Sequence, residues 1–226
     1  MNSLHAGRRS RAQKTLAALR ARYPKPVTQL LAGNAWELLV ATVLAAQCTD
    51  ARVNTVTPAL FARWPGPEAL AGADRAELEA VIRPTGFYRN KAKNLIDAAA
   101  RLCDLFAGSV PRSLEDLVSL PGVARKTANV VLFGAFGINE GLAVDTHVKR
   151  IAYRLGLTGE TQPDAVEKDL MALFPREEWG NINHSVVLFG RDVCHARGPR
   201  CRECDMSAFC PRLEPPRKIP ERRLKK

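Results

Sequence analysis

The sequence predicts an all-α fold. Apolar residues recur at helical spacing along almost the whole chain, and no segment sustains the apolar–polar alternation of a half-buried strand. Turn signals rich in Gly and Pro separate the helical stretches, as at 65–67, 84–86 and 121–122. With 226 residues, of which 46% are hydrophobic, the chain is long enough for one large helical domain or two small lobes with packed cores.

The first helix is predicted close to the N-terminus. Residues 1–26 hold seven basic residues and no acidic one. Within them Leu16, Leu19 and Tyr23 recur at helical spacing, which favours a basic helix. An Arg-rich, acid-free start is also typical of a transit peptide, which is the alternative interpretation.

The second helix, over 35–47, is apolar on nearly every side, which is typical of a buried helix. Further helices are predicted over 51–63, 74–83, 89–106, 113–119, 125–136, 145–155, 163–173 and 182–190. Pro58 is expected to interrupt the helix over 51–63. Four residues stand where helix N-caps belong, namely Asp50, Asp74, Ser113 and Asp145.

The charge balance indicates a polyanionic partner. Lys and Arg number 34 and Asp and Glu 23, so the net charge is 34 − 23 = +11, and the isoelectric point is near 9.8. Nucleic acid is the usual partner of so basic a chain, and a merely basic soluble protein is the alternative. The segment after Cys210 is basic and rich in Pro, so it is expected to be extended, either contacting phosphates or simply solvated.

Membrane and secreted classes are disfavoured by the sequence. No apolar run reaches the length of a membrane span, and no secretory signal is present. The protein is therefore expected inside the cell, in the cytoplasm or nucleoid, with organellar targeting as the alternative that the basic start leaves open.

Four of the six cysteines crowd together as C-x6-C-x2-C-x5-C, at Cys194, Cys201, Cys204 and Cys210. Outside a secreted context, such crowding favours a metal site over disulfides. Spacing alone leaves zinc and a [4Fe–4S] cluster equally open, because both accept four thiolates. The other two cysteines, Cys48 and Cys103, are interpreted as buried, unreactive thiols.

A short basic loop joins the first two of these cysteines. It carries Arg197 and Arg200, and coordination at both of its ends would hold it in shape. The loop is a candidate phosphate contact, and a solvated metal-site loop is the alternative.

A second candidate site follows the helix over 113–119. The turn Leu120-Pro-Gly-Val-Ala124 and the next helix direct backbone N–H groups outward at a helix N-terminus, which suits a DNA phosphate. Gly122, Val123 and Ala124 are therefore candidate DNA contacts. Lys126 falls in the first turn of that helix, where the positive end of the helix dipole disfavours a cation.

If the site is also partly dry, the Lys126 amine loses its proton more readily and becomes a nucleophile. It would attack the sugar carbon of a nucleotide, expel the base and form a Schiff base that permits β-elimination. Asp145, 19 residues further on, would stabilise positive charge on the sugar or relay protons. The plainer alternatives are a surface lysine and an ordinary N-cap.

Four ordered motifs resemble the endonuclease III family of the helix-hairpin-helix DNA glycosylase superfamily. They are LAAQCTD at 44–50, GFYRNKAKN at 86–94, LPGVARKTANVVL at 120–132 with VDTH at 144–147, and the cysteine spacing. The motifs lie between Leu44 and Cys210, and the resemblance as a whole covers the chain from about residue 10 to Cys210.

The resemblance implies two lobes: a six-helix barrel over 28–139 with the helix-hairpin-helix, and an iron–sulfur cluster lobe from 1–27 and 140–226, with DNA in the cleft between them. It implies that Lys126 is the Schiff-base lysine and Asp145 the catalytic aspartate. It also implies a structural [4Fe–4S] cluster, a monomer, and a bifunctional glycosylase and abasic-site lyase acting on oxidised pyrimidines in duplex DNA.

Extrusion of a nucleotide leaves a gap in the base stack. By the same resemblance Gln47 is the gap-filling residue and Phe87 the wedge between bases, although Phe87 is equally a candidate core aromatic. Three residues depart from the family pattern: Ala124 replaces a second Gly, Cys48 a small residue, and Phe87 an aliphatic one. If Ala124 needs a positive φ, the phosphate contact is weakened.

Two rival functions are weighed against this one. An adenine-specific or mismatch-thymine glycosylase shares the hairpin, the aspartate and the cluster. The adenine-specific type lacks the lysine and has a further C-terminal domain, whereas this chain has Lys126 and ends 16 residues after its last cysteine. A non-enzymatic iron–sulfur DNA-binding protein is the rival from another class, and the pairing of Lys126 with Asp145 argues against it.

Overall fold

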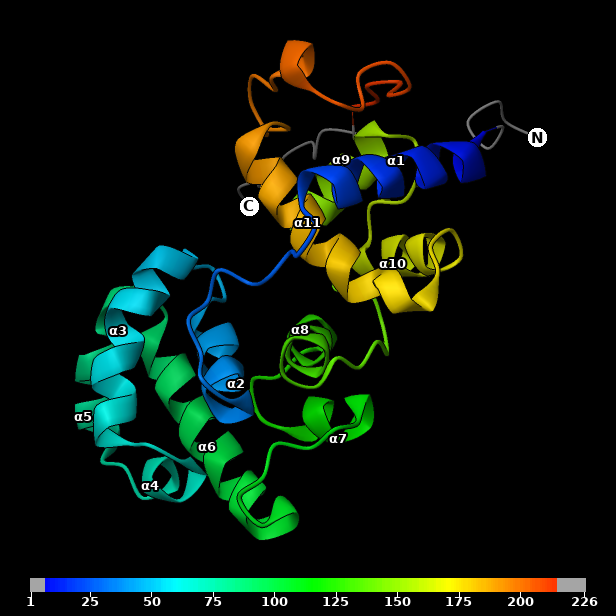
Figure 1. Cartoon of the computed structure of the whole chain (residues 1–226). Helices are drawn as coiled ribbons and strands as arrows, with labels where there is room; N and C mark the ends of the chain where they lie inside the picture. Colours follow the sequence, from blue (N-terminus) through cyan, green and yellow to red (C-terminus); the bar gives the residue numbers. More distant parts are fainter. Residues whose placement is uncertain (1–6, 215–226) are drawn as a thin grey trace, which may run out of the picture. The chain divides into compact units, whose positions relative to one another are not determined.

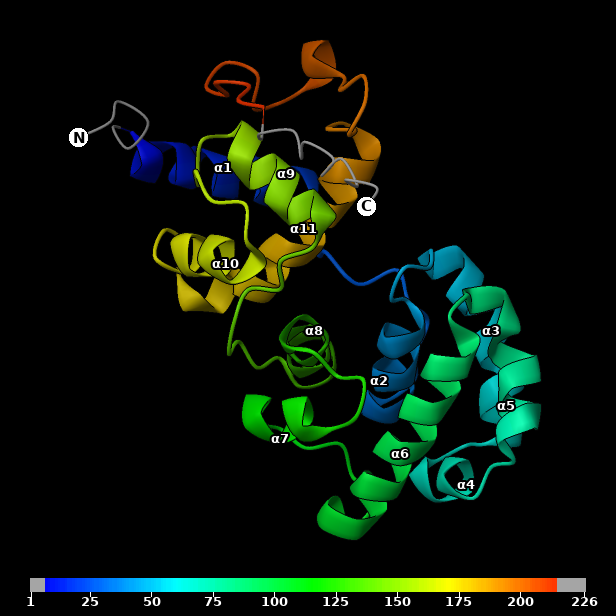
Figure 2. The same ribbon diagram turned by 180° about the vertical axis from the view of Figure 1, so that it is seen from behind.

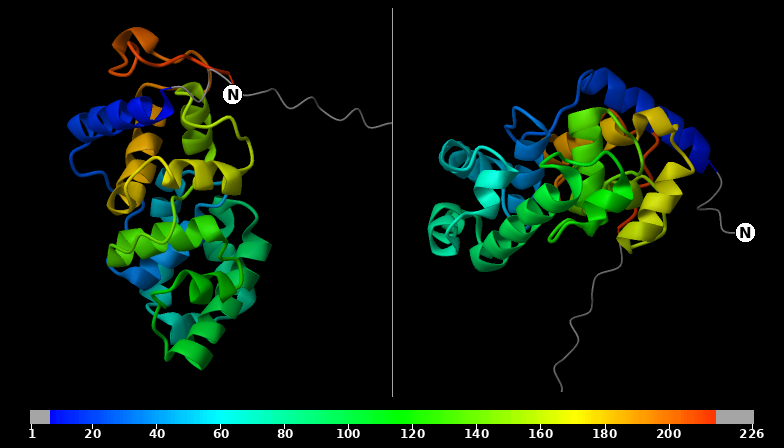
Figure 3. Two further views of the ribbon diagram at one scale, coloured as in Figure 1. Left: turned by 90° about the vertical axis from the view of Figure 1, so that its right-hand side faces the viewer. Right: turned by 90° about the horizontal axis from the view of Figure 1, so that it is seen from below.

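The computed structural model describes residues 7–214, and every regular element in that range is a helix (Figures 1, 2 and 3). The predicted all-α fold is therefore confirmed. Of the basic segment predicted to be extended after Cys210, residues 211–214 have no regular structure and residues 215–226 lie outside the described residues. Within 7–214, no helix is both long enough and apolar enough to cross a membrane.

The described residues form two compact units. The first comprises 7–24, 144–174 and 186–214, and the second comprises 25–143 and 175–185. The division falls inside α11 (Trp179–Asp192), after Ser185. Residues 175–185 thus belong by their contacts to the second unit, whereas the sequence grouped them with the cluster lobe.

The first unit contains α1 (Arg8–Arg22), α9 (Thr146–Arg154), α10 (Pro163–Met171), the C-terminal half of α11 and the 3-10 turn η3 (Cys201–Glu203). The basic helix predicted at the N-terminus is present as α1. Two of its arginines fasten it to the turn after α9: Arg8 Nε donates to the carbonyl of Leu157 and Arg11 Nη2 to that of Gly156, each over 2.9 Å.

The second unit contains the remaining α-helices and two 3-10 turns. In chain order they are α2 (Ala35–Leu44), α3 (Asp50–Arg63), α4 (Pro67–Ala71), α5 (Arg75–Ile82), η1 (Arg83–Thr85), α6 (Tyr88–Phe106), α7 (Leu114–Ser119), α8 (Arg125–Phe136) and η2 (Arg176–Glu178). The first turns of α11 complete the unit. The long helix α6 packs against α4 and α5, while α2 packs against α8 (Figure 1).

The core of the second unit is built around α2. Eight of its ten residues are buried, which confirms the prediction of a helix apolar on nearly every side. Leu39, Val40 and Leu44 from α2 meet Leu95 and Leu102 from α6 in one hydrophobic cluster. This core fixes the ends of the helices whose following loops carry the candidate DNA contacts.

The predicted interruption at Pro58 is wrong, because α3 runs unbroken through it. Proline inside a helix costs about 3 kcal/mol. Against this, Val53, Val56 and Leu60 on α3 are buried in the core. Full burial of such a side chain contributes roughly 1.5–3 kcal/mol, so the packing of this helix outweighs the proline.

Three of the four predicted N-caps are confirmed. Asp74, Ser113 and Asp145 each accept a hydrogen bond from the backbone N–H three residues ahead. The prediction for Asp50 is wrong by one position, since Thr49 caps α3 and Asp50 is its first residue. A threonine hydroxyl serves a cap as a carboxylate does, so the sequence alone does not separate two adjacent candidates.

Candidate functional site

Buried side chains and a backbone hydrogen bond fix the conformation of the hairpin between α7 and α8. Leu120 and Val123 are buried in the core, and the N–H of Val123 donates to the carbonyl of Leu120 over 3.1 Å. The backbone donor of Val123, predicted to contact phosphate, is therefore used within the turn. Gly122 has φ +78°, and a Cβ there would lie 2.8 Å from the Cβ of Asn94 on α6. Glycine is required at that position both for its conformation and for its space.

Ala124 does not need glycine's freedom. Its φ is −86° and its ψ 165°, an extended conformation that any residue adopts, so the weakened contact considered from the sequence does not follow. Ala124 is the N-cap of α8 and has no side chain to cap it. The first-turn amides of α8 are thus left without a capping side chain, an arrangement that suits an anion at the helix N-terminus.

Lys126 is the second residue of α8, and it is exposed. A buried histidine, His184 on the first turns of α11, lies within its electrostatic reach. Burial, and after it the charge of Lys126, lowers the pKa of His184 to about 4. The His184 ring also lies 5.5 Å, centroid to centroid, from the ring of Phe133 on α8. His184 is therefore a neutral imidazole near neutral pH, and the sequence did not single it out.

His184 gives the second unit a definite pH dependence. In the unfolded chain its pKa is near 6.5, so between pH 6.5 and 4 the unfolded state binds a proton that the native state does not. The contribution of neutral His184 to the free energy of unfolding is therefore fully present above pH 6.5. It declines as the pH falls toward 4, by up to about 3 kcal/mol. Urea unfolding followed by Trp emission at stepped pH measures this.

The matched variants for that measurement are His184→Gln and His195→Gln. The first should flatten the pH dependence between pH 4 and 6.5, and the second should keep it, because His195 belongs to the other unit. If the free energy of unfolding of His184→Gln still fell between pH 6.5 and 4 as in the wild type, His184 would not be the source of the pH dependence.

Asp145 belongs to the first unit, whereas Lys126 belongs to the second. Asp145 is half-buried and is the N-cap of α9, with its Oδ1 accepting from the N–H of Val148 over 2.8 Å. One carboxylate oxygen is thus fixed by the helix. Such a fixed carboxylate can still present its second oxygen to a substrate.

Gln47 and Phe87 share an uncommon backbone conformation. Both are exposed, Phe87 to 62%, which excludes the core interpretation of this aromatic ring. Their φ values are +54° and +48°, in the left-handed region that side chains seldom adopt. Backbone conformations of this kind cluster at ligand-binding positions. Tyr88 beside Phe87 is half-buried against the core.

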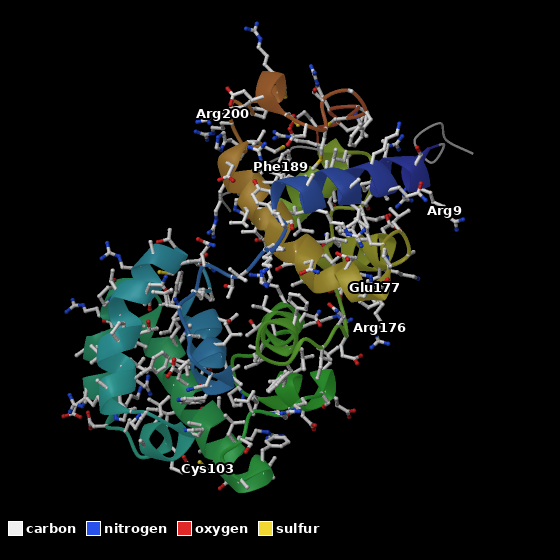
Figure 4. All side chains as sticks on the ribbon, viewed as in Figure 1. Arg9, Cys103, Arg176, Glu177, Phe189 and Arg200 are labelled. Atoms are coloured by element: carbon white, nitrogen blue, oxygen red, sulfur yellow. The ribbon has the colours of Figure 1, made fainter. Side chains whose placement is uncertain are left out.

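The four clustered cysteines line one cavity. Its volume is about 50 Å³, and its other lining residues include the apolar Phe189 (labelled in Figure 4) and Met206 and the charged Arg154. Burial raises the pKa of the Cys204 and Cys210 thiols. All six cysteines are unbridged, so the disulfide alternative is excluded. Among residues 7–214, no group of three or more His, Cys, Asp or Glu side chains is placed to hold a metal ion.

Arg154 on α9 organises the segment that carries these cysteines. Its Nη1 donates to the Sγ of Cys194 over 3.5 Å and to the carbonyl of His195 over 2.7 Å, and its Nη2 donates to the carbonyl of Ala196 over 3.2 Å. Arg197 and Arg200 in the following loop are exposed, and Arg200 is labelled in Figure 4. The sequence did not identify Arg154, because its partners lie some 40 residues away.

Comparison with known proteins places these features in a family. Residues 40–176 match the family described as HhH-GPD superfamily base excision DNA repair protein. The endonuclease III of Synechocystis sp. is 52% identical over 91% of this chain and 94% of its own length. The endonuclease III of Bacillus subtilis is 44% identical over 83% of this chain and 86% of its own.

Solved structures agree with the sequence relatives. A non-covalent endonuclease III–DNA complex has a TM-score of 0.86 and 42% identity, covering 90% of this chain and 95% of the other. A trapped endonuclease III–DNA covalent intermediate has a TM-score of 0.83, again at 42% identity, over 89% and 96% of the two chains. The chain therefore belongs to the HhH-GPD superfamily of base excision DNA repair proteins, and within it to the endonuclease III family.

Proposed function

We propose that this chain removes oxidised pyrimidines from duplex DNA and then cleaves the strand, with Lys126 as the attacking amine. As a member of the endonuclease III family it is a DNA glycosylase and abasic-site lyase of base excision repair. The proposal for Lys126 depends on one observation above all: an exposed lysine in the first turn of a helix whose N-terminus follows a glycine hairpin and lacks a capping side chain.

In the proposed reaction Lys126 Nζ bonds to C1′ of the extruded nucleotide while the bond between C1′ and the base breaks. The base leaves with a proton, and the sugar ring opens to a Schiff base. Loss of a proton from C2′ then expels the 3′ phosphate, and water finally releases the amine. Asp145 would stabilise the positive charge that develops on the sugar, or accept a proton, through the oxygen that does not cap α9.

DNA would be held mainly through its backbone. The N-terminus of α8, with Gly122 and Ala124 before it, suits one phosphate, and the exposed Arg197 and Arg200 suit others. Gln47 would fill the space left by the extruded nucleotide, and Phe87 would enter between bases. Such contacts carry no sequence information, as a repair enzyme that must act in any sequence requires.

The four cysteines are proposed to hold a [4Fe–4S] cluster. They fit it because they line one cavity with largely apolar walls, and because each iron of such a cluster takes one thiolate. Zinc is the alternative that accepts the same four thiolates, and the metal content and absorbance of the purified protein separate the two. The cluster would fix the shape of the basic loop between Cys194 and Cys201.

The test of the proposed function is chemical capture of the intermediate. The purified protein is incubated with an abasic duplex in the presence of borohydride, which reduces a Schiff base to a stable bond. Peptide mapping of the conjugate by mass spectrometry should locate the link at Lys126. Attachment at another residue, or no conjugate with any abasic or oxidised-pyrimidine duplex, would overturn the proposal.

A further inference from the structure

A buried lysine lies behind the two exposed residues Gln47 and Phe87. Lys91, in the first turn of α6, is only 5% exposed. Its ammonium donates to two backbone carbonyls, those of Leu44 and Thr85, each over 2.8 Å. A buried cation is unfavourable unless it is hydrogen-bonded, and these two carbonyls meet that requirement. Without the ammonium, the same two carbonyls would lose a donor.

The first carbonyl belongs to the end of α2. Leu44 is the last residue of that helix, where carbonyls have no partner four residues ahead. The N–H of Cys48, which would close the next turn, donates instead to Ala45. Lys91 therefore binds an orphan carbonyl at the negative end of the helix dipole, three residues before Gln47.

The second carbonyl belongs to the turn before α6. Thr85 is buried and precedes Phe87 by two residues, with only Gly86 between them. The backbone N–H of Lys91 donates in addition to the carbonyl of Phe87 over 3.1 Å. One residue thus bonds to the backbone on both sides of Phe87 and to the helix end that leads to Gln47.

The conformations of these two loops need such support. Among residues 7–214, only four residues other than glycine have positive φ, namely Gln47, Phe87, Ala107 and Arg212. Two of the four are thus the residues proposed to enter the DNA. A strained backbone persists only where its surroundings hold it, and here the shared support is the Lys91 ammonium.

We propose that Lys91 is a positioning residue that holds Gln47 and Phe87 at a fixed separation, so that both enter the base stack together. The inference rests on the proposed function, because it takes Gln47 and Phe87 as the residues that enter the duplex. Lys91 itself is buried and acts through the two loops.

The role predicts a selective defect. Extruding a nucleotide from a duplex requires the gap to be filled, whereas an abasic site in a single strand has no such stack to enter. Lys91→Met removes the ammonium but keeps a long apolar side chain. It should slow single-turnover cleavage of an abasic duplex by about ten- to hundredfold, the effect of losing buried hydrogen bonds to a charged group. Cleavage of the same oligonucleotide as a single strand should change little.

The quantity to measure is the ratio of the duplex rate to the single-strand rate. This ratio is independent of the fraction of folded protein, so it remains informative even if Lys91→Met is destabilised. A 2-aminopurine beside the abasic site reports unstacking directly, and its fluorescence rise should be reduced in Lys91→Met. Lys91→Arg, which keeps a cation able to donate to both carbonyls, should restore part of the ratio.

The variants Gln47→Ala and Phe87→Ala separate two ways in which the proposal could fail: a wrong role for Lys91, or a wrong assignment of Gln47 and Phe87 to the base stack. If both slow duplex cleavage while Lys91→Met keeps the wild-type ratio, the positioning role is wrong and the proposed function stands. If neither slows duplex cleavage, the assignment of these residues to the base stack is wrong, and the role of Lys91 is overturned with it. A double variant Lys91→Met/Phe87→Ala should be no worse than the poorer single variant, because the two residues act as one unit.

Discussion

Replacing Lys126 by alanine is expected to abolish strand cleavage and covalent capture together. Loss of an essential nucleophile lowers turnover by roughly 10⁴- to 10⁶-fold, because no other group at the site forms the Schiff base. Single-turnover cleavage of an oxidised-pyrimidine duplex, followed on denaturing gels, measures the loss. Binding of an abasic duplex should change by no more than a few-fold, since the proposed hairpin contacts to phosphate come from the backbone.

Lys168→Ala is the matched control for this prediction. Lys168 is an exposed lysine on α10, in the unit that does not contain the hairpin, so its loss removes one positive charge without touching the proposed reaction. It should retain wild-type cleavage. If Lys126→Ala instead cleaves abasic duplex at more than about a hundredth of the wild-type rate, the amine is not the nucleophile.

The parts of the fold that sequence predicted are those set by local rules. Helical periodicity located the main helices, and short polar side chains located the caps at Asp74, Ser113 and Asp145. A cap acts on an N–H three residues away, so its signal is local. The ends were less well predicted: the helix expected over 35–47 stops at Leu44, before the positive φ of Gln47.

The parts that sequence missed depend on partners far along the chain. Lys91 bonds to a carbonyl 47 residues before it, and His184 owes its lowered pKa to burial and to Lys126. One signal was present: Lys91 lies in register with Leu95, Ala98 and Leu102 on the buried face of α6. A lysine within an apolar stripe indicates a buried cation with fixed acceptors, but no sequence pattern says which carbonyls accept from it.

Loss of one cluster cysteine is expected to unfold the end of the first unit while leaving the second intact. Residues 194–214 contain one short 3-10 turn, η3, and a single buried hydrophobic residue, Met206. A segment with so little regular structure and so little buried apolar surface needs other links to stay ordered, and we propose that coordination by the four cysteines supplies them.

Cys204→Ser should therefore lose the absorbance near 400 nm that the proposed cluster gives, and trypsin should cut within 194–214. Cys103 is a cysteine of the second unit and is labelled in Figure 4. The control variant Cys103→Ser should keep both the absorbance near 400 nm and the resistance of residues 194–214 to trypsin. The three tryptophans, Trp36, Trp64 and Trp179, all belong to the second unit, so native Trp emission in Cys204→Ser shows that this unit stays folded. A colourless wild-type protein containing one zinc would contradict the cluster yet keep the dependence on coordination. Full trypsin resistance in Cys204→Ser would contradict the dependence on coordination, because the segment would then be ordered without its complete set of cysteine ligands.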